Sequence, residues 1–183
     1  MKKIFALAAM LVLASVSMAQ AAGSVTKQIE LGLSGGVAVP TDAGLDLGFG
    51  GQAYGLYKAD EKLGFGLGVG FHTFTVTGSV SGASASDSSL EIQALLKAAF
   101  SDSATKPYVL VGAGLSSFST SISIFGVSVS GSSMYPMVSG GLGIQIPAGD
   151  TMNIFVQGQA EIVLASGSTF TYIPAELGIN FDM

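Results

Sequence analysis

The chain has 183 residues, of which twelve are acidic, seven are basic and none is cysteine, and its formal net charge is −5. This charge argues against nucleic acid as a partner, because phosphates require a basic patch. The lack of cysteine excludes a disulfide framework and thiolate chemistry. Only 10% of the residues are charged and the mean hydropathy is +0.60, whereas roughly 25% of a typical soluble domain is charged.

The start of the chain has the three-part layout of a secretory signal peptide. Two lysines follow the first methionine, an apolar stretch covers residues 4–16, and small residues suited to cleavage come next. The apolar stretch is shorter than the ~20 residues that a membrane-spanning helix needs. We therefore predict a cleaved signal peptide over residues 1–21 and a single domain over residues 22–183. Cleavage after Ala19 and cleavage after Ala21 fit equally well.

The rest of the chain alternates apolar residues with small or polar ones, which is the pattern of β-strands with one apolar face. For example, Leu67, Val69 and Phe71 alternate with glycine. Strands of ~9–11 residues suffice to cross a bilayer at a tilt. The pattern predicts eight strands, over residues 29–39, 45–57, 63–71, 90–100, 109–115, 138–146 and 152–164, and from after residue 170 to the terminal Met183.

The connections between these strands alternate in character. Short turns that are charged or contain proline and glycine cover residues 58–62, 101–106 and 147–150, while residues 77–88 and 119–133 are long and rich in serine and glycine. We expect a loop over 77–88 and a hairpin that extends beyond the membrane over 119–133. No apolar run after the signal approaches ~18 residues, so a closed barrel is the remaining way to satisfy the backbone in lipid. The sequence predicts an all-β, up-and-down, antiparallel, eight-stranded transmembrane barrel.

Alternation alone fits both a lipocalin-type barrel, apolar inside, and a membrane barrel, apolar outside. Residue size favours the membrane barrel, because the interior of an eight-stranded barrel only just accommodates its side chains. A water-facing surface of glycine would be poorly solvated. In three strands the non-apolar face is largely glycine, namely Gly64, Gly66, Gly68, Gly70, Gly112, Gly114, Gly141 and Gly143. With the apolar face outward, we expect an aromatic girdle at one interface from Tyr57, Phe65, Phe100 and Phe181.

These features resemble the small eight-stranded outer-membrane β-barrel proteins of Gram-negative bacteria, the OmpA-like and OmpX-like class. In that class the last strand carries an assembly signal, whose positions match Glu176, Gly178, Phe181 and Met183, although Met183 replaces the usual terminal phenylalanine. The resemblance implies a location in the bacterial outer membrane, contact with its lipids, and handling by periplasmic chaperones and the barrel-assembly machinery. We also expect a monomer.

The face opposite the lipid carries the polar residues of the strands, and we interpret it as the lumen. Its predicted polar network consists of Glu30, Asp46, Gln52, Glu91, Gln93, Lys97, Gln157, Gln159, Glu161 and Glu176. Because unpaired buried charge is costly, Lys97 should pair with one or more of Glu30, Glu91 and Glu176, or the acids should take up protons. A stabilising hydrogen-bonded filling is the favoured interpretation, and a narrow, gated, cation-preferring path is the alternative.

His72 is the only histidine, so a multi-histidine metal site is impossible, and we predict no metal ligand, cofactor or catalytic residue. Some eight-stranded outer-membrane barrels are lipid-modifying enzymes that use a histidine with a serine and an acid, but no serine follows His72 at two residues. We expect a non-enzymatic protein with a structural or surface role. A narrow channel for ions or small solutes is the first alternative, and a lipid-A-modifying enzyme is the second.

Overall fold

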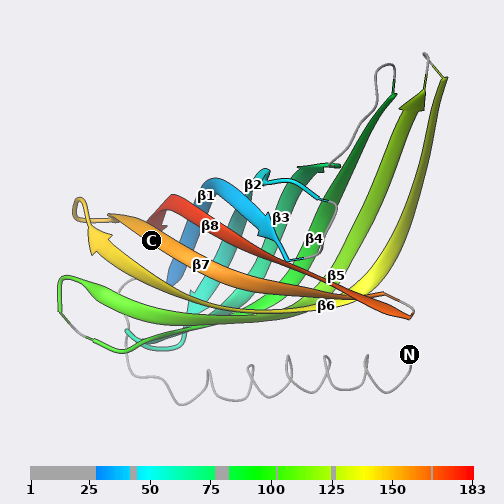
Figure 1. Ribbon diagram of the computed structural model, residues 1–183. Helices are drawn as coiled ribbons and strands as arrows, with labels where there is room; N and C mark the ends of the chain where they lie inside the picture. Colours follow the sequence, from blue (N-terminus) through cyan, green and yellow to red (C-terminus); the bar gives the residue numbers. More distant parts are fainter. Residues whose placement is uncertain (1–27, 42–44, 77–82, 102, 125–126, 166) are drawn as a thin grey trace.

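The computed structural model describes residues 28–41, 45–76, 83–101, 103–124, 127–165 and 167–183. The predicted signal peptide lies outside them. Within this part of the chain, eight antiparallel strands follow one another around a closed barrel, as Figure 1 shows. They are β1 (Ile29–Pro40), β2 (Gly48–Lys58), β3 (Leu63–Thr75), β4 (Ala83–Ala99), β5 (Lys106–Ile124), β6 (Val127–Pro147), β7 (Met152–Ala165) and β8 (Ser168–Asp182). The predicted up-and-down, eight-stranded all-β barrel is confirmed.

The barrel closes through its first and last strands. β1 and β8 pair from Glu30↔Asp182 to Pro40↔Tyr172. The terminal residue takes part, because the Met183 amide donates to the Ile29 carbonyl at 2.8 Å and the Met183 carbonyl accepts from the Ile29 amide at 3.0 Å. The apolar tail is therefore the strand that removes the last two open edges of the sheet.

The two ends of the barrel differ. The short-turn end carries the turns after β2, β4 and β6 together with the two ends of the sheet. The extended end carries the other connections, and there β4, β5 and β6 reach farther than their neighbours, toward the upper right of Figure 1. β5 and β6 remain paired out to Ile124↔Val127, which confirms the predicted hairpin over 119–133.

Several strands are longer than the sequence pattern indicates, and two boundaries change the predicted assignment of individual residues. Residues 83–88 were expected in a loop but belong to β4, where they pair with β5. Serine and alanine have little strand preference of their own, so the pairing partner decides their conformation. β2 begins only at Gly48, whereas the pattern places its start at residue 45; Leu45 instead forms an isolated bridge with Val76.

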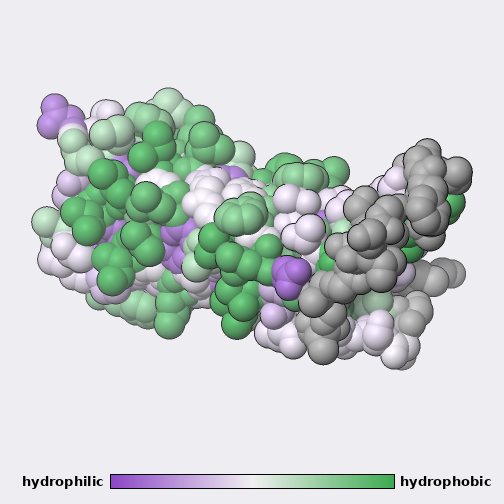
Figure 2. Space-filling model, turned by 45° about the horizontal axis from the view of Figure 1, so that its top comes forward, coloured by the Kyte–Doolittle hydropathy of each residue, from purple (hydrophilic) through white to green (hydrophobic). Residues whose placement is uncertain are grey.

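The apolar face of each strand points outward. Leu67, Leu142 and Leu177 are at least 60% exposed, and Figure 2 shows apolar side chains over much of the visible outer wall. The inward glycines make room for aromatic rings. A Cβ atom at Gly32 would lie 2.1 Å from the Tyr54 ring, and one at Gly143 would lie 2.3 Å from the Tyr108 ring. The lumen therefore has the restricted size that the glycine pattern predicts.

Two apolar clusters lie inside the barrel, one toward each end. The short-turn cluster consists of Tyr54, Leu56, Leu95, Tyr108, Leu110 and Phe155. The extended-end cluster consists of Ala38, Phe74, Met137, Val163 and Tyr172, with Leu45, Tyr135 and Phe170 packed against it. Polar side chains occupy the space between and beside these clusters. Among the described residues, no helix is long and apolar enough to cross a membrane.

Candidate functional site

Nine of the ten residues of the predicted lumen network are buried inside the barrel. The exception is Asp46, which is exposed and precedes the first residue of β2. Its backbone amide donates to the Thr75 carbonyl at 2.8 Å. Leu45 and Leu47 continue the alternation of β2 in the sequence, although the strand begins only at Gly48. The prediction that Asp46 belongs to the lumen network is therefore wrong.

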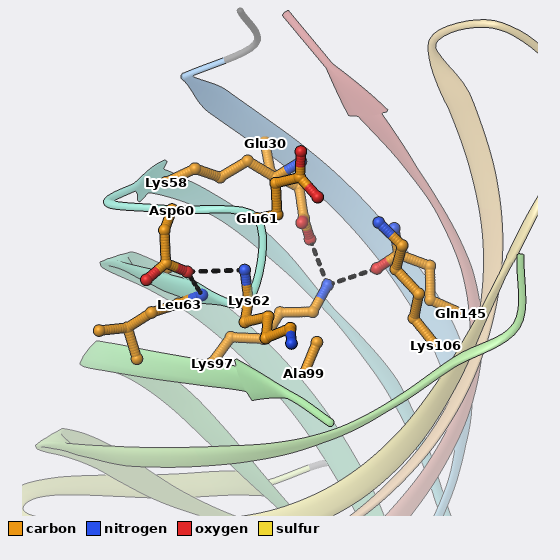
Figure 3. A pocket seen from close by; sticks show the side chains of 11 residues that line it. Glu30, Lys58, Asp60, Glu61, Lys62, Leu63, Lys97, Ala99, Lys106 and Gln145 are labelled. Carbon is orange, nitrogen blue, oxygen red and sulfur yellow. Dashed lines mark hydrogen bonds and ion pairs between the residues drawn. The ribbon is translucent and has the colours of Figure 1, made fainter. Parts of the chain in front are cut away.

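Lys97 is the centre of a charged group at the short-turn end, shown in Figure 3. Its Nζ donates to Glu30 Oε1 and to Gln145 Oε1, both at 2.6 Å, and lies 4.4 Å from the centre of the Tyr108 ring. Glu30 Oε1 also accepts from the Tyr54 hydroxyl at 2.9 Å and from Asn180 Nδ2 at 3.1 Å. Of the three partners proposed for Lys97, the structure pairs it with Glu30.

Glu176 is held in the middle of the barrel by neutral donors. Its Oε2 accepts from Ser34 Oγ at 2.7 Å and from Gln157 Nε2 at 2.9 Å. Gln157 in turn accepts from the Tyr108 hydroxyl at 3.0 Å, which connects this layer to the short-turn cluster. Two further pairs complete the layer, namely Ser139 with Gln93 at 2.6 Å and Gln159 with Gln52 at 3.4 Å.

A second charged group lies beneath the extended-end cluster, and it contains His72, Glu91 and Glu161. His72 Nδ1 lies 3.3 Å from Glu91 Oε1, and His72 Nε2 lies 3.5 Å from Glu176 Oε1. The Tyr172 hydroxyl donates to Glu91 Oε1. One ligand atom from each of His72, Glu91 and Glu161 lies within 4.8 Å of the other two. The three residues come from β3, β4 and β7, and their neighbours Tyr172 and Glu176 come from β8, so four strands meet here.

Several lumen residues are absent from the predicted network. The largest are the buried Tyr54, Tyr108 and Tyr172, whose hydroxyls donate to Glu30, Gln157 and Glu91. Their phase is a usable signal, because each tyrosine lies an even number of residues from a buried polar residue of its own strand, namely Gln52, Ser116 and Glu176 respectively. An assumption that aromatic residues face lipid hides this signal.

The predicted girdle residues Tyr57, Phe65, Phe100 and Phe181 lie at the short-turn end. Phe100 is 64% exposed, Tyr57 packs against Phe65 with ring centres 5.5 Å apart, and Phe181 is 41% exposed. In the proposed assembly signal, Phe181 and Met183 face outward, whereas Glu176 and Gly178 are buried. These positions suit a strand with one lipid face and one lumen face.

A closed antiparallel barrel with an apolar outer wall and a polar interior defines an outer-membrane β-barrel protein. Residues 6–181 match the family described as "Outer membrane protein beta-barrel domain", and the chain belongs to this family. Its location is therefore the bacterial outer membrane.

Solved structures share this fold. Neisserial surface protein A is 16% identical with a TM-score of 0.60, and the match covers 88% of this chain and 99% of that one. Ail, the attachment invasion locus protein of Yersinia pestis, is 16% identical with a TM-score of 0.55, covering 85% and 100%. A major outer membrane protein from Thermus thermophilus is 12% identical with a TM-score of 0.63, covering 87% and 100%. No curated protein matches the chain.

Proposed function

We propose that the protein is a non-conducting, non-enzymatic barrel with a structural and surface role in the outer membrane. The observation that carries this proposal is the filled lumen. The short-turn cluster takes side chains from β2, β4, β5 and β7, and the extended-end cluster takes them from β1, β3, β6, β7 and β8. Side chains from several walls thus meet at two levels, and hydrogen-bonded polar groups fill the layer between them.

The alternative of a narrow cation channel is favoured by one feature, the carboxylates of the lumen. Against it, Glu30 is engaged with Lys97, Tyr54 and Asn180, and Glu176 with Ser34 and Gln157. An ion would have to break these contacts and pass two clusters of mostly apolar side chains. In these clusters the hydroxyls of Tyr54, Tyr108 and Tyr172 already donate to Glu30, Gln157 and Glu91.

Conductance across planar bilayers tests the two possibilities. We expect the folded protein to insert without single-channel steps in concentrated KCl. Cation-selective steps that are lost in Glu30→Gln and kept in Asp60→Asn would contradict the proposal and establish the channel. Asp60 is the matched control, because its exposed carboxylate lies in the turn at the same end and accepts from the Lys62 and Leu63 amides.

The surface role is supported by the part of the sheet that extends beyond the neighbouring strands. From Val127 to Pro136, β6 pairs only with β5. On the face that continues the outer wall, serines occupy successive paired positions, such as Ser86↔Ser121 and Ser119↔Ser132. This polar face follows directly on the apolar wall, so it suits the hydrated layer just outside the hydrocarbon core.

The alternative of a lipid-modifying enzyme receives no support from the position of His72. This residue is 1% exposed and lies inside the barrel beneath Phe74 and Tyr172. Its contacts are with Glu91 and Glu176 rather than with a serine hydroxyl. A lipid in the bilayer has no route to this ring through the wall of paired strands.

We further propose that the last strand is read by the barrel-assembly machinery after periplasmic chaperones deliver the chain, and that the protein is a monomer surrounded by lipid. The outward positions of Phe181 and Met183 support this proposal, because an assembly factor can reach them before the strand pairs with β1.

A further inference from the structure

The lumen has an uneven distribution of charge along its length. At the short-turn end, Lys97 offsets Glu30. At the other end, three buried carboxylates, those of Glu91, Glu161 and Glu176, share a single histidine, and among the described residues no lysine is within ion-pair distance of any of them. Buried charge that is not compensated is strongly unfavourable. Even a protonated His72 leaves more negative than positive charge in this group.

The same residues carry polar atoms without hydrogen-bond partners. They are Glu91 Oε2, Glu161 Oε2, Glu176 Oε1 and His72 Nε2. Glu91, Glu161 and His72 are at most 1% exposed, and Glu176 is 4% exposed, so bulk water does not satisfy these atoms. Buried unsatisfied groups are rare in native proteins and call for a partner. His72 Nε2 and Glu176 Oε1 face each other at 3.5 Å, which leaves Glu91 Oε2 and Glu161 Oε2 as the atoms with neither a hydrogen bond nor an ion pair. Two unpartnered, buried carboxylate oxygens beside a histidine indicate a missing cation.

We propose that His72, Glu91 and Glu161 bind one divalent transition-metal ion of the zinc class. Glu176 lies outside this set of three, and its Oε1, 3.5 Å from His72 Nε2, completes the coordination by moving toward the ion. Three ligand atoms about 2.0–2.2 Å from one metal, in a trigonal or tetrahedral arrangement, lie about 3.3–3.8 Å from each other. The three residues, whose ligand atoms lie within 4.8 Å of one another, therefore have to close by at most about 1.5 Å when the ion binds. One imidazole nitrogen with carboxylate oxygens suits zinc, manganese or iron better than calcium or magnesium, which prefer oxygen ligands alone.

The neighbouring contacts hold these ligands in place. Tyr172 donates to Glu91 Oε1, which leaves Oε2 for the metal. Ser34 and Gln157 occupy Glu176 Oε2, which leaves Oε1 directed toward His72. Such hydrogen bonds from outside the coordination sphere orient metal ligands. The bound ion would connect β3 and β4 to β7 and β8 across the lumen, so its role is to fix opposite walls of the barrel.

The position of the site determines how it is loaded. Phe74, Met137, Val163 and Tyr172 cover it toward the extended end, and the polar layer and the short-turn cluster lie on its other side. We therefore expect the ion to enter as the barrel folds and to leave slowly afterwards. The metal site is independent of the proposed non-conducting role. A barrel that binds no metal and shows no conductance would contradict the metal site and agree with the non-conducting role.

Refolding in detergent with and without ZnCl₂, followed by desalting and elemental analysis, tests the proposal. We expect about one zinc ion per chain after refolding with the metal, and a higher urea midpoint than that of the metal-free protein. Glu161→Gln should reduce bound zinc at least tenfold. Glu30→Gln is the matched control, because it removes a buried carboxylate from the same lumen outside the site, and it should retain the ion.

A second measurement separates metal binding from a purely structural role of Glu161. Without metal, Glu161→Gln should be at least as stable as the unaltered protein, because it removes one uncompensated charge. With zinc, the order should reverse. Less than a tenth of an equivalent of zinc in the unaltered protein, or equal zinc loss in Glu161→Gln and Glu30→Gln, would overturn the proposal.

Discussion

At the scale of single residues, the direction of each side chain follows from its parity within a strand, and its partner follows from the barrel geometry. Parity places Glu30, Glu91 and Glu176 inside, as the burial pattern shows. It does not say which of them meets Lys97, because the strands that carry them stand at different angles and heights around the axis. Residue type is a poor guide to the face on which a side chain lies, because Tyr57 faces lipid whereas Tyr54, three residues earlier, faces the lumen.

Lys97 provides the test of the residue contacts at the short-turn end. Lys97→Met should lower the free energy of unfolding by on the order of 3 kcal/mol, because removal of one partner leaves Glu30 as an unpaired buried charge. The urea midpoint of the protein in detergent, followed by the heat-dependent shift in gel mobility, measures this effect. The variant Lys97→Met with Glu30→Gln should recover part of the loss. An unchanged midpoint in Lys97→Met would show that the pair does not stabilise the barrel.

At the scale of elements, the period-two pattern predicts all eight strands and errs mainly in their lengths. On the outward face the apolar residues end and serines follow, so this face marks the membrane-spanning part of β4, β5 and β6 and not their extensions. The inward face of the extension carries residues such as Ile122 and Val129, which are 44% and 70% exposed, so only the serine-rich outward face has the composition of a loop. Pairing between neighbouring strands, rather than side-chain burial, extends the sheet there.

The last strand provides the test at this scale. Phe181→Ala should reduce the folded, membrane-inserted fraction in cells severalfold. The reason is that the variant lacks the outward aromatic residue by which, in our proposal, the assembly machinery recognises the last strand before it pairs with β1. Phe100→Ala is the matched control, since Phe100 is an outward aromatic residue at the same end but outside the tail. The two variants should refold equally well from urea into detergent. Equal insertion of both variants in cells would remove Phe181 from the assembly signal.

At the scale of the whole molecule, closure of the barrel creates the contacts that no single strand predicts. Asn180 reaches Glu30 across the β1–β8 seam, and Lys97 reaches Glu30 and Gln145 from another wall. Such contacts depend on the stagger between strands, which the number of strands alone does not determine. For this reason the sequence identifies most members of the lumen network but not its division into a compensated group around Lys97 and an uncompensated group around His72.

The same architecture predicts which end of the molecule faces the outside of the cell. Both ends of the sheet lie at the short-turn end, which in this class of barrel faces the periplasm, so the extended sheet should face outward. The chain contains no cysteine, so single cysteines can be introduced without background. In intact cells, a membrane-impermeant maleimide should label Ser130→Cys, whose position in β6 is exposed, and should not label Ala148→Cys, which is also exposed, in the turn after β6. Both should react after the outer membrane is permeabilised. Labelling of Ala148→Cys alone in intact cells would show that the barrel has the opposite orientation, and the surface role assigned to the extended sheet would then be wrong.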